Sequence, residues 1–284
     1  MTFQEFRMAH PLDFDALLFD IDGTLIVGGK PLPGANELLQ ELRRNNFPFA
    51  IVTNDANHSL EEKCAYACRS GVPFTPDEVV SSGGALTGFV QKENLQGKLF
   101  FIMGELGNPC YAENAGLRTT RDPRRFPECD GVIQGEGTYD WLDHMTAAVN
   151  YFRARPDAWY IVPNPDVFWP GPKGTLGVGA GGQAQFICRL LEHQGICKEP
   201  VYLGKPFEPI YENALTFLQR KYGLPDDFDR KRVLMLGDSL TSDVRGSNEN
   251  GLTSALLLTG ITSREQADRA EGIFRPDWCF ESLR

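Results

Sequence analysis

The stretch ALLFDIDGTL, residues 16–25, places two aspartates two positions apart at the end of an apolar run and just before a glycine. The run Ala16–Asp20 is typical of a buried strand. Asp20 and Asp22 then lie where the strand leaves the sheet, and Gly23 allows the backbone to turn sharply there. Two carboxylates this close repel each other, so we expect a cation to keep both in use at neutral pH. Mg²⁺, which prefers oxygen ligands, fits best.

Taken alone, this motif has other interpretations. An EF-hand calcium loop is excluded because the acidic series that such a loop needs does not follow. A plain solvated turn remains an alternative for the motif by itself.

Short apolar runs alternate with helical periodicity along the chain, a pattern that predicts an α/β fold with a parallel sheet. Apolar residues recur at three- and four-residue spacing in 35–42, 186–191 and 207–218, which indicates helices that face a sheet. The expected strands are Ala16–Asp20, Phe49–Thr53, Leu99–Met103, Gly131–Gln134, Trp159–Val162, Val201–Leu203, Val233–Gly237 and Ser254–Leu257.

The way the strands end predicts how the chain is divided. Open α/β sheets bind ligands at the carboxyl ends of their strands, so strands with polar endings are expected to share one sheet and one site. The strands within 99–162 lack such endings, which favours a separate insert. We therefore expect a catalytic core from 1–83 and 202–284, with 84–201 as an inserted α/β cap. The polar endings are Asp20–Thr24, Thr53–Asn54, Gly204–Pro206 and Gly237–Asp238.

Bulk composition excludes several classes of protein. The 284 residues carry a formal net charge of −10 with no Lys/Arg-rich block, which argues against a nucleic-acid partner or an anionic membrane surface. No apolar leader and no bilayer-length run is present, so we expect a cytoplasmic protein. The cysteines are scattered and odd in number, which favours reduced thiols. Cys64 and Cys68 could share a helix face, but no second pair completes a zinc set.

Other strand ends supply groups that would complete a site with the first motif. VLMLGDSLTSD, residues 233–243, places Asp238 at a strand end and Asp243 at the start of an expected helix, where the pair could hold a metal or cap the helix. AIVTN, residues 50–54, adds the Thr53 hydroxyl, and YLGKP, residues 202–206, adds the Lys205 ammonium. Carboxylates, a hydroxyl and an ammonium are together what phosphoryl transfer through an aspartyl intermediate requires.

With FDIDGTL, VTN, GKP and GDSLTSD in this order, the chain resembles the haloacid dehalogenase superfamily of phosphohydrolases over nearly its whole length. The resemblance implies a Rossmann-like parallel core in which Asp20 is the nucleophile and Asp22 the general acid, then the base. It implies Mg²⁺ held by Asp20, the Asp22 backbone carbonyl and Asp238, with Asp243 as a further ligand or an orienting residue. The implied phosphate-binding residues are Gly23, Thr53, Asn54 and Lys205.

The position of the insert indicates which branch of the superfamily the chain resembles. Between Asp22 and Thr53 there is room for one helix, whereas the interval from Thr53 to Lys205 can hold a domain. The chain is similar to the NagD-like branch in that placement and in the segments VIQGEGTYDWLDHMTAAVNYF, NPD and FRPDW. Members of this branch include phosphatases for nucleoside monophosphates, sugar phosphates, phosphoglycolate and pyridoxal phosphate. By this resemblance the cap contacts the leaving group, although Pro163 and the aromatics that follow the NPD motif depart from the branch. The expected substrate contacts are Asn164, Asp166 and Trp169.

We therefore expect a Mg²⁺-dependent phosphomonoester hydrolase acting through an aspartyl phosphate on a small phosphorylated metabolite, a sugar phosphate or a nucleoside monophosphate. The alternatives are a phosphotransferase or phosphomutase, a phosphoglycolate or pyridoxal phosphate phosphatase, and a non-catalytic binding protein. Loss of Asp20 or Asp22 would favour the last, and both are present. GVGAGG, residues 177–182, matches a dinucleotide fingerprint only formally and is expected to be a loop-to-helix junction. A homodimer or higher homo-oligomer is compatible with the sequence.

Overall fold

The computed structural model describes residues 1–10, 13–170 and 175–284 and divides them into two compact units. Unit 1 comprises Met1–Thr53, Leu60–Val80 and Lys205–Arg284. Unit 2 comprises Asn54–Ser59 and Ser81–Gly204. The segment Asn54–Ser59, which the sequence placed in the core, packs with unit 2 instead. Residues 171–174, part of the sequence between the NPD motif and GVGAGG, lie outside the described residues.

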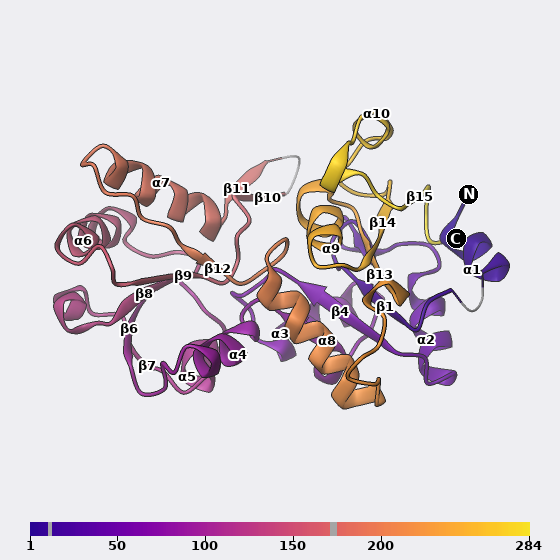
Figure 1. Ribbon diagram of the computed structural model, residues 1–284, viewed down its shortest axis with the longest axis horizontal. Coiled ribbons are helices and arrows are strands. Elements are labelled where there is room, and N and C mark those ends of the chain that lie inside the picture. The colour runs from indigo at the N-terminus through magenta and orange to yellow at the C-terminus, as the bar shows by residue number, and fades with distance from the viewer. Residues whose placement is uncertain (11–12, 171–174) are drawn as a thin grey trace. The chain divides into compact units, whose positions relative to one another are not determined.

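Unit 1 is built on a sheet with the strand order β15-β14-β13-β1-β4-β5 (Figure 1). The central strand β1 pairs in parallel with β13 on one side and with β4 on the other. Every residue of β1, β4, β13 and β14 is buried, as expected for strands covered on both faces. The strand bounds are β1 Ala16–Phe19, β4 Phe49–Thr53, β5 Val79–Ser81, β13 Val233–Gly237, β14 Thr253–Leu257 and β15 Trp278–Phe280.

Helices cover both faces of this sheet. Leu17 and Phe19 of β1 pack in one apolar cluster with α1, α2 and α3, and Leu18 packs in another with α8. α8 ends at Gly223, whose φ of 73° gives the left-handed cap that glycine favours. The remaining bounds in unit 1 are α1 Phe3–Ala9, β2 Ile26–Val27, β3 Lys30–Pro31, α2 Ala35–Arg44, α3 Leu60–Arg69, α8 Glu208–Tyr222, α9 Arg245–Glu249 and α10 Arg264–Asp268.

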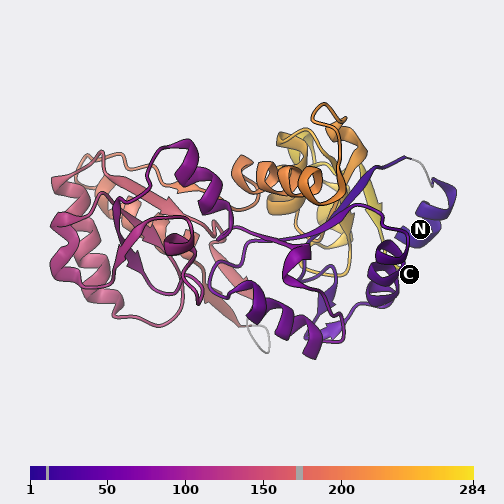
Figure 2. The same cartoon turned by 90° about the horizontal axis from the view of Figure 1, so that it is seen from below.

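Unit 2 contains its own sheet, with the order β12-β9-β8-β6-β7 and parallel pairing throughout (Figures 1 and 2). Helices α6 and α7 share one apolar cluster with the sheet, and α4 and α5 share the other. β10 and β11 form a separate antiparallel pair. The bounds are α4 Ala85–Lys92, β6 Leu99–Met103, α5 Tyr111–Asn114, β7 Arg118–Thr120, β8 Gly131–Gln134, α6 Trp141–Ala154, β9 Trp159–Val162, β10 Phe168–Pro170, β11 Leu176–Val178, α7 Ala180–Glu192 and β12 Val201–Tyr202.

The predicted α/β class is confirmed, but the prediction for the strand Val201–Leu203 is wrong. It was expected in the same sheet as the strand of Asp20, yet β12 pairs with β9 in unit 2. The polar residues after this strand led to the wrong sheet assignment, because Lys205 follows the strand at the point where the chain has already entered unit 1. Of the loop-to-helix junction expected at 177–182, the helix start is present, since α7 begins at Ala180, but Gly177 and Val178 belong to strand β11 rather than to a loop.

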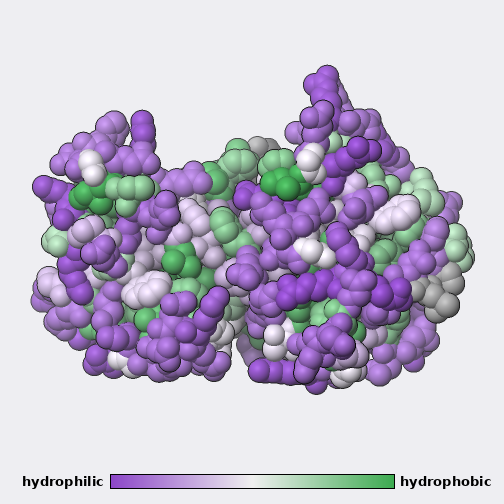
Figure 3. Space-filling model, viewed as in Figure 1, coloured by the Kyte–Doolittle hydropathy of each residue, from purple (hydrophilic) through white to green (hydrophobic). Residues whose placement is uncertain are grey.

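The surface in view in Figure 3 is mainly polar, with apolar residues in separate groups. Within the described part of the chain, no helix has the length and apolar character to cross a membrane.

Candidate active site

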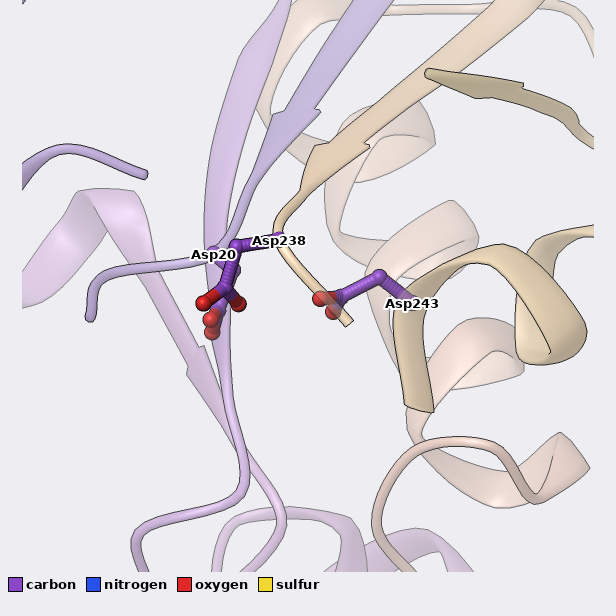
Figure 4. Close-up of side chains that lie close together, drawn as sticks. All are labelled: Asp20, Asp238 and Asp243. Carbon is purple, nitrogen blue, oxygen red and sulfur yellow. The ribbon is translucent and has the colours of Figure 1, made fainter. Parts of the chain in front are cut away.

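Among the described residues, one acidic cluster that could hold a metal ion gathers at the carboxyl ends of β1 and β13 (Figure 4). Asp20 follows β1 and Asp238 follows β13, and the parallel pairing of these strands brings the two residues to the same edge. Asp243 comes from a short π-helical turn, Leu240–Val244. One carboxylate oxygen of each aspartate lies within 4.8 Å of the other two. The three therefore meet although more than half the chain separates the first from the others.

Lys205 supplies the positive charge at this cluster. Its ammonium lies 2.7 Å from Asp20 Oδ1 and 2.7 Å from Asp243 Oδ1, and its side chain is only 2% exposed. Burial alone would lower the pKa of Lys205, but the charges of Asp20 and Asp243 raise it overall. The ammonium consequently stays protonated and neutralises part of the carboxylate charge.

Asp238 is fixed by the loop after β14. Its Oδ2 accepts a hydrogen bond from the Ile261 backbone N–H at 2.8 Å, and its carbonyl accepts one from Thr262 Oγ1 at 2.6 Å. Two glycines leave the room that the carboxylate occupies. A Cβ at Gly260 would lie 1.8 Å from Asp238 Oδ2, and one at Gly23 would lie 2.1 Å from it. Gly23 also has a φ of +80°, so both its conformation and its neighbour exclude a side chain.

The loop after β14 is a part of the site that was not predicted from the sequence. Besides Ile261 and Thr262, it supplies Thr259, whose hydroxyl donates to the Gly23 carbonyl at 2.6 Å. The signal was present: a polar Thr259–Gly260 pair follows an expected strand, as at the other strand ends.

Asp243 is held by the turn that carries it. Its Oδ2 accepts from the Ser239 N–H at 3.1 Å, and its backbone carbonyl accepts from Ser247 Oγ at 2.6 Å. The buried Tyr211 hydroxyl of α8 lies 3.4 Å from the same carbonyl. Because Asp243 Oδ1 faces Lys205, both of its carboxylate oxygens have protein partners.

The electrostatics of the cluster favour a bound cation. Burial raises the pKa of Asp20 well above its ordinary value, with Lys205 opposing and Asp243 and Asp238 adding to the rise. Burial and the charge of Asp243 raise the pKa of Asp238 to about 7. A divalent ion would stabilise the ionised forms of both, and the donors present are the oxygens that Mg²⁺ prefers. The residues therefore fit a hard divalent cation.

The remaining predicted residues of unit 1 lie close to the cluster in sequence or at a neighbouring strand end. Asp22 is exposed, and its side chain is hydrogen-bonded by Tyr66 of α3. Gly23 forms the turn beside Asp238, as described above. Thr53 is the buried last residue of β4, the strand next to β1.

The other predicted residues form a separate group within unit 2. Asn54 Nδ2 donates to Asp166 Oδ1 at 3.0 Å. Asn164 is 7% exposed, and its side chain donates to Glu136 at 2.6 Å and accepts from the Asp166 N–H at 2.9 Å. Trp169 of β10 is 46% exposed, and its ring packs against Gly177. Their roles as phosphate or substrate contacts stay predictions.

Comparison with protein-family models places the chain among hydrolases. A haloacid dehalogenase-like hydrolase model matches residues 17–118, and a HAD-hydrolase-like model matches residues 202–284. The chain is 30% identical over 273 residues to D-glycerol 3-phosphate phosphatase of Mycobacterium tuberculosis, covering 96% of this chain and 70% of that protein. It is 29% identical to dihydroxyacetone phosphatase of Corynebacterium glutamicum, covering 94% of this chain and 88% of that protein.

Solved structures give the same result. The glycerol phosphate phosphatase of Mycobacterium tuberculosis in complex with magnesium matches with a TM-score of 0.78 and 28% identity, covering 96% of this chain and 76% of that one. NagD from Escherichia coli matches with a TM-score of 0.78 and 25% identity, covering 95% and 97%. The likeness thus extends over both units.

Replacing Lys205 with methionine should strongly destabilise the protein. The change leaves Asp20 and Asp243 buried beside each other without their shared counter-charge, and breaking a buried pair in this way costs about 3–5 kcal/mol. Urea unfolding at pH 8 measures the loss. Lys221→Met, which removes a surface ion pair with Asp77, is the control and should cost about 1 kcal/mol or less. Equal losses in the two variants would contradict the arrangement.

The metal-free protein should lose stability as the pH rises from about 4 to about 7. Asp238 releases its proton near pH 4 when unfolded but only near 7 when folded, so the unfolded state gains relative stability across that window. In chelator, urea unfolding of wild type should show this fall, up to about 4 kcal/mol, and Asp238→Asn should show less of it. Mg²⁺ should flatten the wild-type profile. Parallel profiles for wild type and Asp238→Asn in chelator would refute the burial of an ionisable group here.

Proposed function

Because this chain belongs to the haloacid dehalogenase-like hydrolases and is a phosphatase of their NagD-like branch, we propose that it uses a divalent cation, Mg²⁺, and Asp20 to hydrolyse small phosphate monoesters. One observation carries the proposal. Asp20 lies at a strand end with an ammonium 2.7 Å from one oxygen, while two further carboxylates stand beside it. Burying three carboxylates around one lysine is costly, and such costly clusters are typical of functional sites.

Asp20 is the nucleophile in this mechanism. It remains 17% exposed, the most accessible of the clustered carboxylates, and Lys205 favours its ionised form. Asp20 attacks phosphorus as the bond from phosphorus to the ester oxygen breaks, which leaves a phosphoryl group on the Asp20 carboxylate. Thr53 and Lys205 bind the oxygens of the group being transferred.

Asp22 moves the protons. Its exposed side chain donates a proton to the departing ester oxygen, so the alcohol leaves neutral. It then accepts a proton from water, which attacks phosphorus, releases inorganic phosphate and restores Asp20. The Tyr66 hydroxyl bonded to Asp22 holds the side chain in place between the two steps.

Asp20 and Asp238 supply the carboxylate ligands for the cation. The hydrogen bond from Ile261 occupies one oxygen of Asp238 and orients the other. Asp243, whose two oxygens already accept from Lys205 and Ser239, acts by orienting Lys205. When bound, Mg²⁺ neutralises negative charge on the phosphoryl group during transfer.

Small polyol or sugar phosphates are the substrate class that the relatives favour. Those named above are a D-glycerol 3-phosphate phosphatase and a dihydroxyacetone phosphatase, and an acid sugar phosphatase of Staphylococcus saprophyticus is 27% identical to the chain. A nucleoside monophosphate is the second candidate, because the exposed Trp169 ring could stack on a base.

Asp20→Asn should abolish Mg²⁺-dependent hydrolysis of p-nitrophenyl phosphate, lowering kcat by about 10⁴-fold or more because the amide is no nucleophile. Phosphate release from the purified protein measures this, with Asp15→Asn, which removes a carboxylate paired with Arg232, as the control. Wild type in excess chelator should also be inactive. Activity that persists in Asp20→Asn or in chelator would remove the mechanism.

Trp169→Ala should change the ranking of substrates more than the turnover of p-nitrophenyl phosphate. Loss of a stacking surface costs a base-bearing ester about tenfold in kcat/KM, whereas glycerol 3-phosphate has no ring to stack. Initial rates on glycerol 3-phosphate, a sugar phosphate and a nucleoside monophosphate give the ranking. Trp141→Ala, at another half-exposed tryptophan of unit 2, is the matched control. An unchanged ranking would contradict a substrate contact at Trp169.

A further inference from the structure

A buried carboxylate in unit 2 has no part in the chemistry above. Glu136 follows β8 and is 5% exposed. Its Oε1 accepts from Asn164 Nδ2 at 2.6 Å and from the Ala180 N–H, at the start of α7, at 3.1 Å. Its Oε2 accepts from Asn57 Nδ2 at 2.8 Å, and its own N–H donates to Asn57 Oδ1 at 3.2 Å. One carboxylate thus joins three segments that are far apart in sequence.

These bonds continue into a closed network. Asn164 Oδ1 accepts from the Asp166 N–H at 2.9 Å, and Asp166 Oδ1 accepts from Asn54 Nδ2 at 3.0 Å. A path that leaves the segment Asn54–Ser59 at Asn57 therefore returns to it at Asn54. We call Asn54, Asn57, Glu136, Asn164 and Asp166 the Glu136 network. Because the path closes, no member can shift without breaking bonds at two places.

The segment Asn54–Ser59 is the part that this network controls. It directly follows Thr53, the proposed phosphate contact, yet it packs with unit 2. Further bonds reach its backbone from Ser82 Oγ, the Gly107 N–H and the Tyr111 hydroxyl, at 2.6, 3.0 and 2.9 Å. Glu136 is the member that ties this segment both to Asn164 and to α7.

The chemistry of the site requires a carboxylate at position 136. All three donors that face its two oxygens are N–H groups, and a carboxylate can accept from each. An amide would turn an N–H₂ group towards another N–H donor and leave buried donors unpaired. The three N–H donors around position 136 therefore favour glutamate there, although burying its charge is unfavourable.

We propose that Glu136 is a positioning residue for substrate discrimination. It holds Asn57 and Asn164, and through Asn164 also Asp166 and Asn54, in the single arrangement that reads the alcohol part of the substrate. The inference rests on the proposed function and on the sequence-based expectation that Asn164 and Asp166 contact the substrate. Asn164 contributes by holding Asp166, since both of its polar groups are engaged inside unit 2.

A pair swap between positions 57 and 136 tests this role. Glu136→Gln places an amide donor against the Asn57 amide, and Asn57→Asp places two carboxylates against each other. In the double variant the new amide at position 136 donates to the new carboxylate at position 57, and its oxygen still accepts from Asn164 and Ala180. The side-chain bond between the two positions is thus remade with donor and acceptor exchanged. The double variant therefore restores the side-chain bond, with the negative charge moved from position 136 to position 57.

Steady-state kcat and KM on glycerol 3-phosphate and p-nitrophenyl phosphate are the readouts, with melting temperature recorded for each variant. Each single variant should lower kcat/KM for glycerol 3-phosphate at least tenfold more than for p-nitrophenyl phosphate, chiefly through KM. The double variant should return the ratio of the two esters to within threefold of wild type. A double variant as defective as Glu136→Gln would overturn the inference, because restoring the bond between the two positions would then not restore discrimination.

Gln183→Met separates positioning from a general loss of stability. Gln183 is buried in α7 of the same unit and accepts from Gln134 Nε2 at 2.8 Å, but within the described part of the chain it has no bond to the Glu136 network. This variant should lower the melting temperature while leaving the ratio of the two esters unchanged. An equal change of ratio would overturn the inference. Wild type that hydrolyses neither ester would overturn the proposed function, and the inference with it.

Discussion

The ammonium of Lys205 between Asp20 and Asp243 is the interaction on which the rest of unit 1 depends. At 2.7 Å from each carboxylate, it is the one cation that the described residues place within the acidic cluster. Without it, three acidic side chains at one sheet edge would have to take up protons or spread apart. Lys205 lowers the cost of ionising Asp20, and a bound divalent cation would lower it further, while the side chain stays partly accessible.

The backbone makes this crowding possible. Gly23 and Gly260 leave space for the Asp238 carboxylate, and a Cβ at Gly237 would lie 2.1 Å from Asp243 Cγ. Each of these two carboxylates thus sits where a glycine has removed the competing side chain. The loop after β14 then supplies the N–H that orients Asp238. Substitution at any of these glycines would disturb the site without touching a reacting group.

Much of the core could be predicted because four of its strands are fully buried runs of four or five mostly apolar residues. β1, β4, β13 and β14 follow the expected segments closely, and the convergence of Asp20 with Asp238 follows from their pairing. β5 and β15, with three residues each, are too short to be distinguished from loops by pattern alone. β12 was assigned to the wrong sheet because Lys205, three residues after the strand ends, already belongs to unit 1, whereas the strand pairs within unit 2.

The site residues show the same division between local and long-range information. A sequence motif can identify Asp20 or Lys205 as a site residue, because the strand or turn that carries each residue is formed by its neighbours in the sequence. No local sequence pattern predicts the role of Glu136, because its partners Asn57 and Asn164 are brought together only by the tertiary fold. Asn164 was noticed for its position in a motif, but its hydrogen bonds with Glu136 and the Asp166 N–H cannot be derived from that motif. Polar residues buried by long-range packing are where sequence reasoning has the least to use.

A crystal structure grown with Mg²⁺ and beryllium trifluoride, a mimic of a phosphoryl group on a carboxylate, tests the central claim most directly. Our account predicts the trifluoride bound to an Asp20 oxygen, Mg²⁺ beside it on Asp20 and Asp238, and Lys205 still within hydrogen-bonding distance of Asp20. A trifluoride group on any other side chain, or an ion bound away from Asp238, would contradict it.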